Sequence, residues 1–129
     1  MSNIVALMEA QSVFERKDQM DRQTLFDAAV SLGEWGIFSN RSITKITGLR
    51  PRDVAVLTPK SERTGGRFEP EVLPDLISLA RTGERGEMDV FTAKRVLDHC
   101  SSYYASRLSG IARSNLVRWA EKAALMEAV

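Results

Sequence analysis

The sequence has only one cysteine and one histidine among its 129 residues, and this scarcity limits the chemistry open to the chain. The single cysteine, Cys100, excludes a disulfide within the chain and is typical of a reducing compartment. It stands beside the single histidine, His99, but consecutive residues of a helix point about 100° apart. We therefore expect these two residues to close a helix rather than to form a thiol–imidazole pair.

Other catalytic signatures are also missing. No histidines, cysteines or carboxylates have the spacing of metal ligands, of an acid–base pair or of a nucleophilic triad. The glycines Gly65 and Gly66 lack the lysine and serine pattern of a phosphate-binding loop. We expect a protein that is not an enzyme and that has no metal, no cofactor and no small-molecule substrate.

Long hydrophobic runs are absent as well. No segment approaches the roughly 18 consecutive apolar residues of a membrane span. The start of the chain has no basic region followed by an apolar core, which a signal peptide requires. With 43% hydrophobic and 27% charged residues, the composition is ordinary for a soluble globular protein. These features predict a cytoplasmic protein with no membrane partner.

The net charge is only +1, but the positive charge is concentrated in two segments. Seven basic residues face two acidic ones in 39–67, and six face two in 94–122. Segments 1–38 and 69–89 are net negative. Because charge acts over a Debye length of about 8 Å, the local potential of a basic segment attracts a polyanion whatever the total charge. A solvated globule without such a partner remains the alternative interpretation.

The two basic segments contain one pattern twice, displaced by 62 positions. Each copy has an expected N-cap serine, two apolar residues before a turn glycine and three apolar residues after it. The first copy is Ser39, Ile43, Ile46, Gly48, Leu49, Val54 and Leu57, and the second is Ser101, Ala105, Leu108, Gly110, Ile111, Leu116 and Trp119. This spacing predicts two pairs of short helices, each joined by a sharp turn. Glycine suits the turn because the left-handed backbone region costs other residues roughly 1–2 kcal/mol.

The segments ITKITGLRPRDVAVL and ASRLSGIARSNLVRW each resemble the helix-turn-helix of bacterial and phage DNA-binding regulators. The resemblance covers about a third of the chain and implies a DNA-binding role. Both copies depart from the usual small residue four positions before the turn glycine, since Thr44 stands there in the first copy and Ser106 in the second.

Candidate DNA contacts lie on the second helix of each copy and in the loop after the first copy. On the second helices they are Arg50, Arg52 and Val56 in the first copy, and Arg113, Ser114, Asn115, Arg118 and Lys122 in the second. Arginine can bind guanine bidentately and phosphate oxygens less specifically. Val56 would contact a thymine methyl or pack against the following loop. The alternative for these residues is the solvated face of a three-helix bundle.

The segment TPKSERTGGR, residues 58–67, is the clearest loop in the chain. Its basic residues Lys60, Arg63 and Arg67 would follow the DNA backbone or enter a minor groove, as flexible arms do. A small β-wing over 58–68 and an ordinary linker are the alternatives.

We predict an all-α fold of about six to seven helices in four parts. These are an N-terminal helix (1–20), a first helix-turn-helix unit with the basic loop (21–68), a bridging helix (69–87) and a second unit with the C-terminal helix (88–129). Within them, helix 21–32 is expected to end at Gly33 and Gly36 with Trp35 in the core, and helix 71–81 to end at 82–86. In 88–100, Val90, Phe91, Val96 and Leu97 are expected inward and Lys94 and Arg95 outward.

These expectations combine into one preferred function, sequence-specific binding of double-stranded DNA by a transcriptional repressor. Because the two copies expose different residues, the site should have two unequal halves, about one helical turn or roughly 34 Å apart. The alternatives are a phage architectural or packaging factor, such as an excision factor or a small terminase subunit, and a protein-interaction module or inhibitor. The C-terminal helix would form a homodimer or complete the monomer core.

Overall fold

The computed structural model describes residues 3–58 and 66–128, and this part of the chain contains eight α-helices and no strand. They are α1 (Ile4–Arg16), α2 (Arg22–Glu34), α3 (Asn40–Thr47), α4 (Pro51–Leu57), α5 (Leu73–Glu84), α6 (Val90–His99), α7 (Ser102–Ser109) and α8 (Arg113–Glu127). Short 3-10 turns, Lys17–Gln19 and Pro70–Val72, follow α1 and precede α5. The predicted all-α class is confirmed, with slightly more helices than expected.

The two predicted helix pairs are present, and their backbones match position by position. Ser39 and Ser101 accept a hydrogen bond from the amide of the third residue that follows, which caps α3 and α7. The same two helices end at Gly48 (φ 77°) and Gly110 (φ 79°), both in the left-handed region. In each copy the second helix begins three residues after the glycine, α4 at Pro51 and α8 at Arg113.

The apolar positions of both pairs form part of one core. The buried members are Ile43, Ile46 and Val54 in the first pair, and Ala105, Leu108, Ile111, Leu116 and Trp119 in the second. Leu49 and Leu57 are partly buried against the same core. The second copy also uses its unusual Ser106, whose hydroxyl donates to the carbonyl of Ile111 across the turn (2.6 Å).

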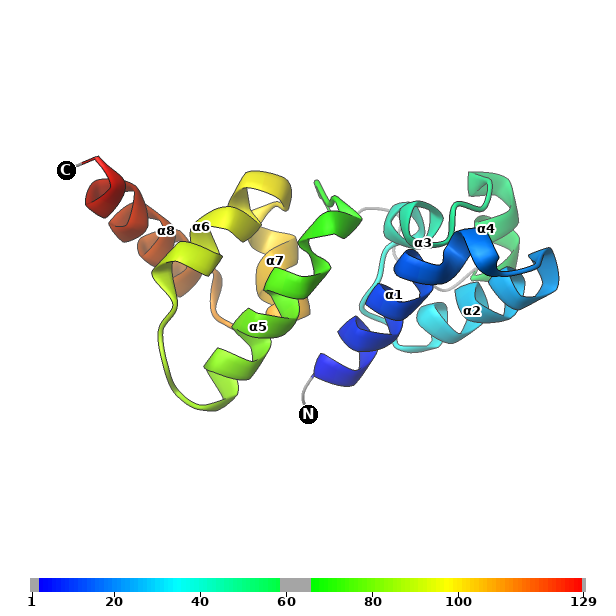
Figure 1. The fold of residues 1–129 in the computed structure, drawn as a ribbon, viewed down its shortest axis with the longest axis horizontal. Helices are drawn as coiled ribbons and strands as arrows, with labels where there is room; N and C mark the ends of the chain where they lie inside the picture. The colour runs from blue at the N-terminus through cyan, green and yellow to red at the C-terminus, as the bar shows by residue number, and fades with distance from the viewer. Residues whose placement is uncertain (1–2, 59–65, 129) are drawn as a thin grey trace.

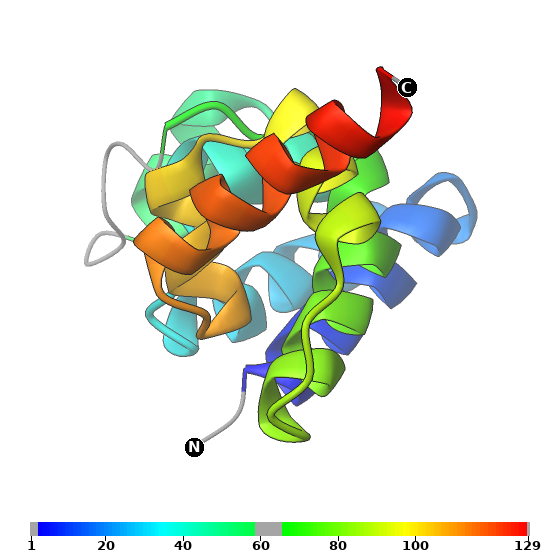
Figure 2. The same ribbon diagram turned by 90° about the vertical axis from the view of Figure 1, so that its left-hand side faces the viewer.

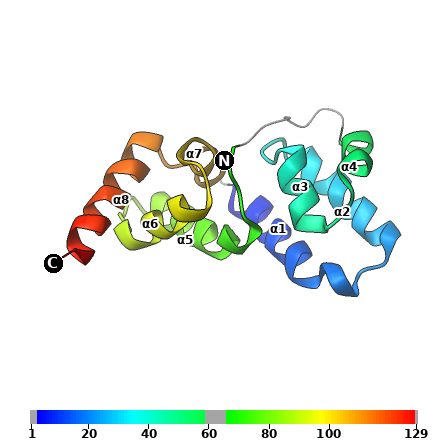
Figure 3. The same cartoon turned by 90° about the horizontal axis from the view of Figure 1, so that it is seen from above.

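The helices form an elongated molecule in which α4 and α8 lie at opposite ends of the long axis (Figure 1). At the centre, α1 packs against α5, and α5 also contacts α6 and α7. Figure 2, which looks along the long axis, shows α8 in front, where it packs along α6. Seen from above, α3, α4, α7 and the start of α8 lie along one long side, and α1 and α5 lie along the other (Figure 3). The two helix pairs therefore share one side of the molecule.

Two predicted helix ends are wrong because glycine does not stop either helix. Helix α2 continues through Gly33 to Glu34, and the left-handed Gly36 (φ 74°) follows it. Helix α5 likewise continues through Gly83 to Glu84. A glycine inside a helix costs only about 1 kcal/mol, which packing offsets. Gly83 packs so closely on the second pair that an added Cβ would lie 3.0 Å from the Ile111 side chain.

Two aromatic residues predicted to face inward are partly exposed. Trp35 is 41% exposed, and its indole N–H donates to the carboxylate of Glu9 (2.8 Å). Phe91 is also 41% exposed. Both stand at a helix end, Trp35 as the C-cap of α2 and Phe91 in the first turn of α6, where the core covers only part of the side chain. The outward prediction for Arg95 is confirmed, since it is exposed and pairs with Asp75.

Replacing Gly110 by valine is expected to lower the free energy of unfolding by about 1–2 kcal/mol. An added Cβ would meet no atom within 4 Å, so the cost is conformational rather than steric. Asparagine tolerates the left-handed region, so Gly110→Asn should cost less. Urea unfolding followed by circular dichroism measures both variants, and equal losses for valine and asparagine would contradict this explanation.

Candidate nucleic-acid interface

The first two turns of α8 bring together most of the residues predicted for the second copy. Arg113, Ser114 and Arg118 are exposed and line one shallow hollow on the surface. Val117 and Glu121 line the same hollow, and the sequence interpretation did not include them. Glu121 introduces a negative charge beside the arginines, which weakens this hollow as a purely electrostatic anion site. Lys122 is exposed one turn further along the helix.

The two arginines of α8 are held by different neighbours. The Nε of Arg113 donates to the hydroxyl of Ser102 at the start of α7 (2.8 Å). Arg118 donates to the side-chain oxygen of Asn115 (2.6 Å), one turn earlier on the same helix. Arg113 is therefore tied to the first helix of the pair, whereas Arg118 is oriented within α8. These different tethers suggest different roles for the two guanidinium groups.

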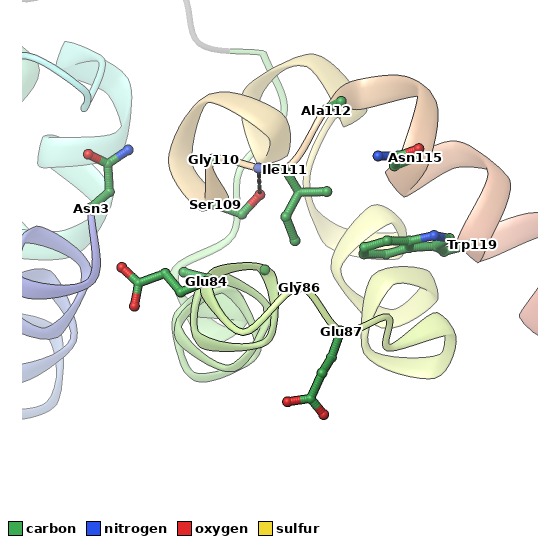
Figure 4. Close-up of a pocket in the computed structure, with 12 residues that line it drawn as sticks. Asn3, Glu84, Gly86, Glu87, Ser109, Gly110, Ile111, Ala112, Asn115 and Trp119 are labelled. Carbon is green, nitrogen blue, oxygen red and sulfur yellow. Dashed lines mark hydrogen bonds between the residues drawn. The ribbon is translucent and has the colours of Figure 1, made fainter. Parts of the chain in front are cut away.

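Asn115 lies differently from the prediction. It is half-buried and lines a hollow of about 680 Å³ between the end of α5 and the turn before α8. Figure 4 shows Ile111 and Trp119 beside this hollow, which Glu84 and Glu87 also line. Asn115 therefore lines this hollow and also accepts a hydrogen bond from Arg118, and this bond positions the arginine.

A second surface hollow was not foreseen from the sequence. Tyr103, Ser106, Arg107 and Arg113 line it, and Tyr103 is 74% exposed. The sequence repeat could have indicated this position. Tyr103 corresponds to Arg41 of the first copy, 62 residues earlier, and both residues are exposed. The outward side of α7 therefore adds the Tyr103 hydroxyl beside Arg113, whereas the Arg107 guanidinium donates to the carbonyl of Gly36 (2.8 Å).

The first copy presents fewer free charges than its sequence suggests. Arg50, the N-cap residue of α4, pairs with Asp53 (3.0 Å), and Arg22 approaches the same carboxylate (3.6 Å). Arg52 is exposed, and within the described residues it makes no ion pair. Val56 is 79% exposed, so its side chain is open to solvent. Arg52 and Val56 are the available groups of α4.

The basic loop contributes one described candidate. Lys60 and Arg63, together with most of segment 58–68, for which a β-wing was one alternative, lie outside the described residues. Arg67 is exposed and pairs with Glu69 (3.0 Å), whose other oxygen lies 3.1 Å from the Nδ1 of His99. The hydrogen bond from Arg67, and then that from His99, lowers the pKa of the Glu69 carboxyl.

The neighbouring residues His99 and Cys100 point apart. The imidazole of His99 is exposed toward Glu69, whereas Cys100 is buried and pairs through its backbone with Phe68 in an isolated antiparallel bridge. Burial raises the pKa of the Cys100 thiol to about 12. The thiol is therefore protonated at neutral pH and is a poor nucleophile.

Alkylation of Cys100 by iodoacetamide at pH 8 is expected to be slow in the native protein and fast after unfolding in urea. With a pKa of about 12, the thiolate fraction at pH 8 is on the order of 1 in 10,000. Because the chain has one cysteine, the mass gained on labelling reports this site only. A short peptide containing Cys100 serves as the exposed control, and a native rate equal to that of the peptide would contradict the burial.

Across residues 3–58 and 66–128, no three histidines, cysteines or carboxylates are grouped as metal ligands would be. No helix in these ranges is long and apolar enough to span a bilayer. No protein-family model, no curated protein and no solved structure matches the chain.

Proposed function

We propose that the chain binds double-stranded DNA in a sequence-dependent manner through its two helix pairs and acts as a transcriptional repressor. The observation that carries this proposal is the repetition of one cap, turn and helix geometry at a displacement of 62 residues. In both copies an exposed arginine stands in the first turn of the second helix, Arg52 in α4 and Arg113 in α8. Since both pairs lie along one side of the molecule, they are suited to one duplex (Figure 3).

The side chains divide into two groups by their tethers. Arg113 is bonded to Ser102 and lies beside the hydroxyl of Tyr103, an arrangement that suits a backbone phosphate with its diffuse negative charge. Arg118 is exposed and oriented by Asn115, an arrangement that suits the two acceptors of guanine in the major groove. In this proposal Arg113 supplies affinity through counterion release, and Arg118 supplies discrimination between bases.

The experiment that tests the proposal is selection of bound sequences from a random duplex library at about 150 mM salt, where nonspecific phosphate binding is weakened. Enrichment of a two-part motif is the expected result. The matched control is Arg85→Ala, which removes an exposed arginine outside both pairs and should leave the motif unchanged. Absence of enrichment would contradict sequence-specific binding.

A protein-interaction module is the second candidate, and the end of α8 favours it. Leu125 and Met126 are 72% and 51% exposed there. This end lies beside α6, since Glu127 pairs with Lys94 (3.3 Å), and Phe91 stands exposed one turn before Lys94. A homodimer through this surface would appear as a concentration-dependent mass in sedimentation velocity, and Leu125→Asp should abolish it.

A further inference from the structure

The two helix pairs meet through a buried tyrosine. Tyr104 of α7 is 1% exposed, and its hydroxyl accepts a hydrogen bond from the amide of Ser39 (3.0 Å). The same hydroxyl lies 2.7 Å from that of Ser42, with which it shares a second hydrogen bond. Ser42 and Tyr104 are equivalent positions of the two copies, 62 residues apart. The first helices of the two pairs are thus joined at the same position of each.

The hydrogen bonds of the Tyr104 hydroxyl share Ser39 and Ser42 with the N-cap of α3. The hydroxyl of Ser39 accepts from the amide of Ser42 and donates to the hydroxyl of Ser42 (3.1 and 3.0 Å). The ring of Tyr104 packs edge to face on Phe68, with 5.6 Å between the ring centroids. Because these polar groups are buried, leaving one without a partner is costly, so the orientation that satisfies all of them is favoured.

Further hydrogen bonds connect the first helix of each pair to the backbone of the other half of the molecule. Lys45 of α3 donates to the carbonyl of Phe68 (2.9 Å). Arg107 of α7, the equivalent position, donates to the carbonyl of Gly36 (2.8 Å). The side chain of Asn3, just before α1, donates to the carbonyls of Arg107 and Leu108 (3.0 and 3.3 Å). With the packing of α1 on α5, these bonds fix the two pairs relative to each other.

We propose that Tyr104 and Ser42 are positioning residues that hold the two helix pairs at one separation, so that the chain accepts DNA half-sites at a single spacing. This inference rests on the proposed DNA binding. Adding one base pair between half-sites moves the second one about 3.4 Å along the duplex and roughly 34° around it. A protein whose two helix pairs are fixed relative to each other loses contacts at such a displacement. A protein whose helix pairs move relative to each other can follow the displaced half-site.

The experiment compares binding to duplexes whose two half-sites, taken from the selected motif, are separated in steps of one base pair over about one helical turn. The wild-type chain should prefer one spacing, with affinity falling about tenfold for a one-step change. Tyr104→Phe keeps the ring on Phe68 but removes the hydroxyl, and it should reduce this preference to about twofold or less. Its affinity for a duplex with one half-site should stay unchanged.

The matched control is Ser31→Ala, which removes a hydroxyl that donates to Glu9 away from the contact between the two pairs and should keep the spacing preference. Ser42→Ala tests the same junction from the other side if Tyr104→Phe fails to fold by circular dichroism. A folded variant that keeps the wild-type preference would overturn the proposal. So would a wild-type chain that enriches a motif but tolerates every spacing, and this outcome would leave sequence-specific binding intact.

A measurement without DNA separates the junction from the proposed function. Nitrogen-15 relaxation reports the tumbling of each helix pair, and the wild-type chain should tumble as one body. Tyr104→Phe should still tumble as one body but should add microsecond-to-millisecond exchange broadening at residues of α3 and α7. The same exchange behaviour in the wild type and in this variant would overturn the role of the hydroxyl, whether or not the chain binds DNA.

Discussion

The double substitution Arg113→Ala and Arg118→Ala is expected to erase one half of the selected DNA motif and to leave the other half readable. Arg118 should contribute about 1–3 kcal/mol to binding of the specific site through its base contact, and the loss of Arg113 should weaken binding to every sequence in addition. Both residues are exposed on α8 and neither belongs to the core, so the fold should be unaffected. Selection with the variant, followed by titration of the wild-type site, measures the loss.

The single substitutions should differ because the two arginines have different tethers. Arg113→Ala should weaken all sequences alike and reduce the slope of log affinity against log salt by about one. Arg118→Ala should relax the preference at one base position with little change in that slope. Arg85→Ala measures the change in affinity caused by losing one exposed arginine outside the helix pairs. Indistinguishable single variants would contradict the division between phosphate contact and base contact.

The parts of the fold that depend on local sequence could be predicted. The N-cap serines, the turn glycines and the apolar spacing around them are fixed by bonds and packing within about one turn of helix. Ser39 and Ser101 cap as predicted, and Gly48 and Gly110 adopt the predicted left-handed conformation. The repeat at 62 residues made this inference stronger, because two independent stretches agreed.

The helix ends at glycine could not be predicted in this way, because long-range contacts decide them. Gly83 remains helical where it packs against Ile111, and that contact joins residues of α5 and the second turn. A rule based on local sequence ends a helix at glycine, because glycine is about 1 kcal/mol less favourable than alanine inside a helix. Tertiary packing outweighs a term of that size.

The candidate interface was predicted only in part for a related reason. Lys45 and Arg107 count as positive charges in the sequence, yet both donate to carbonyls of the opposite side of the junction. Asn115 orients Arg118 and lines a separate hollow. Charge and spacing locate the basic segments of the chain, but they do not show which cationic side chains already have hydrogen-bond partners within the protein. The contact between equivalent positions Ser42 and Tyr104 left no pattern in the sequence.

Leu76→Ala is expected to lower the free energy of unfolding by about 2–5 kcal/mol and to shift the unfolding of both helix pairs together. Leu76 is fully buried in α5, the helix that contacts α1, α6 and α7. If the junction makes the chain one cooperative unit, a cavity at its centre destabilises both sides equally. The exposed Leu125 provides the control, since Leu125→Ala should change stability by less than about 0.5 kcal/mol.

The two tryptophans make this cooperativity measurable. Trp35 stands at the end of α2, on the side of the first pair, and Trp119 lies within α8. Trp119→Phe leaves a probe of the first side, and Trp35→Phe leaves a probe of the second. In either background, Leu76→Ala should move the urea midpoint by the same amount. A shift seen by Trp119 with no shift seen by Trp35 would show two independent units. A chain of that kind could not hold its two helix pairs at one spacing on DNA.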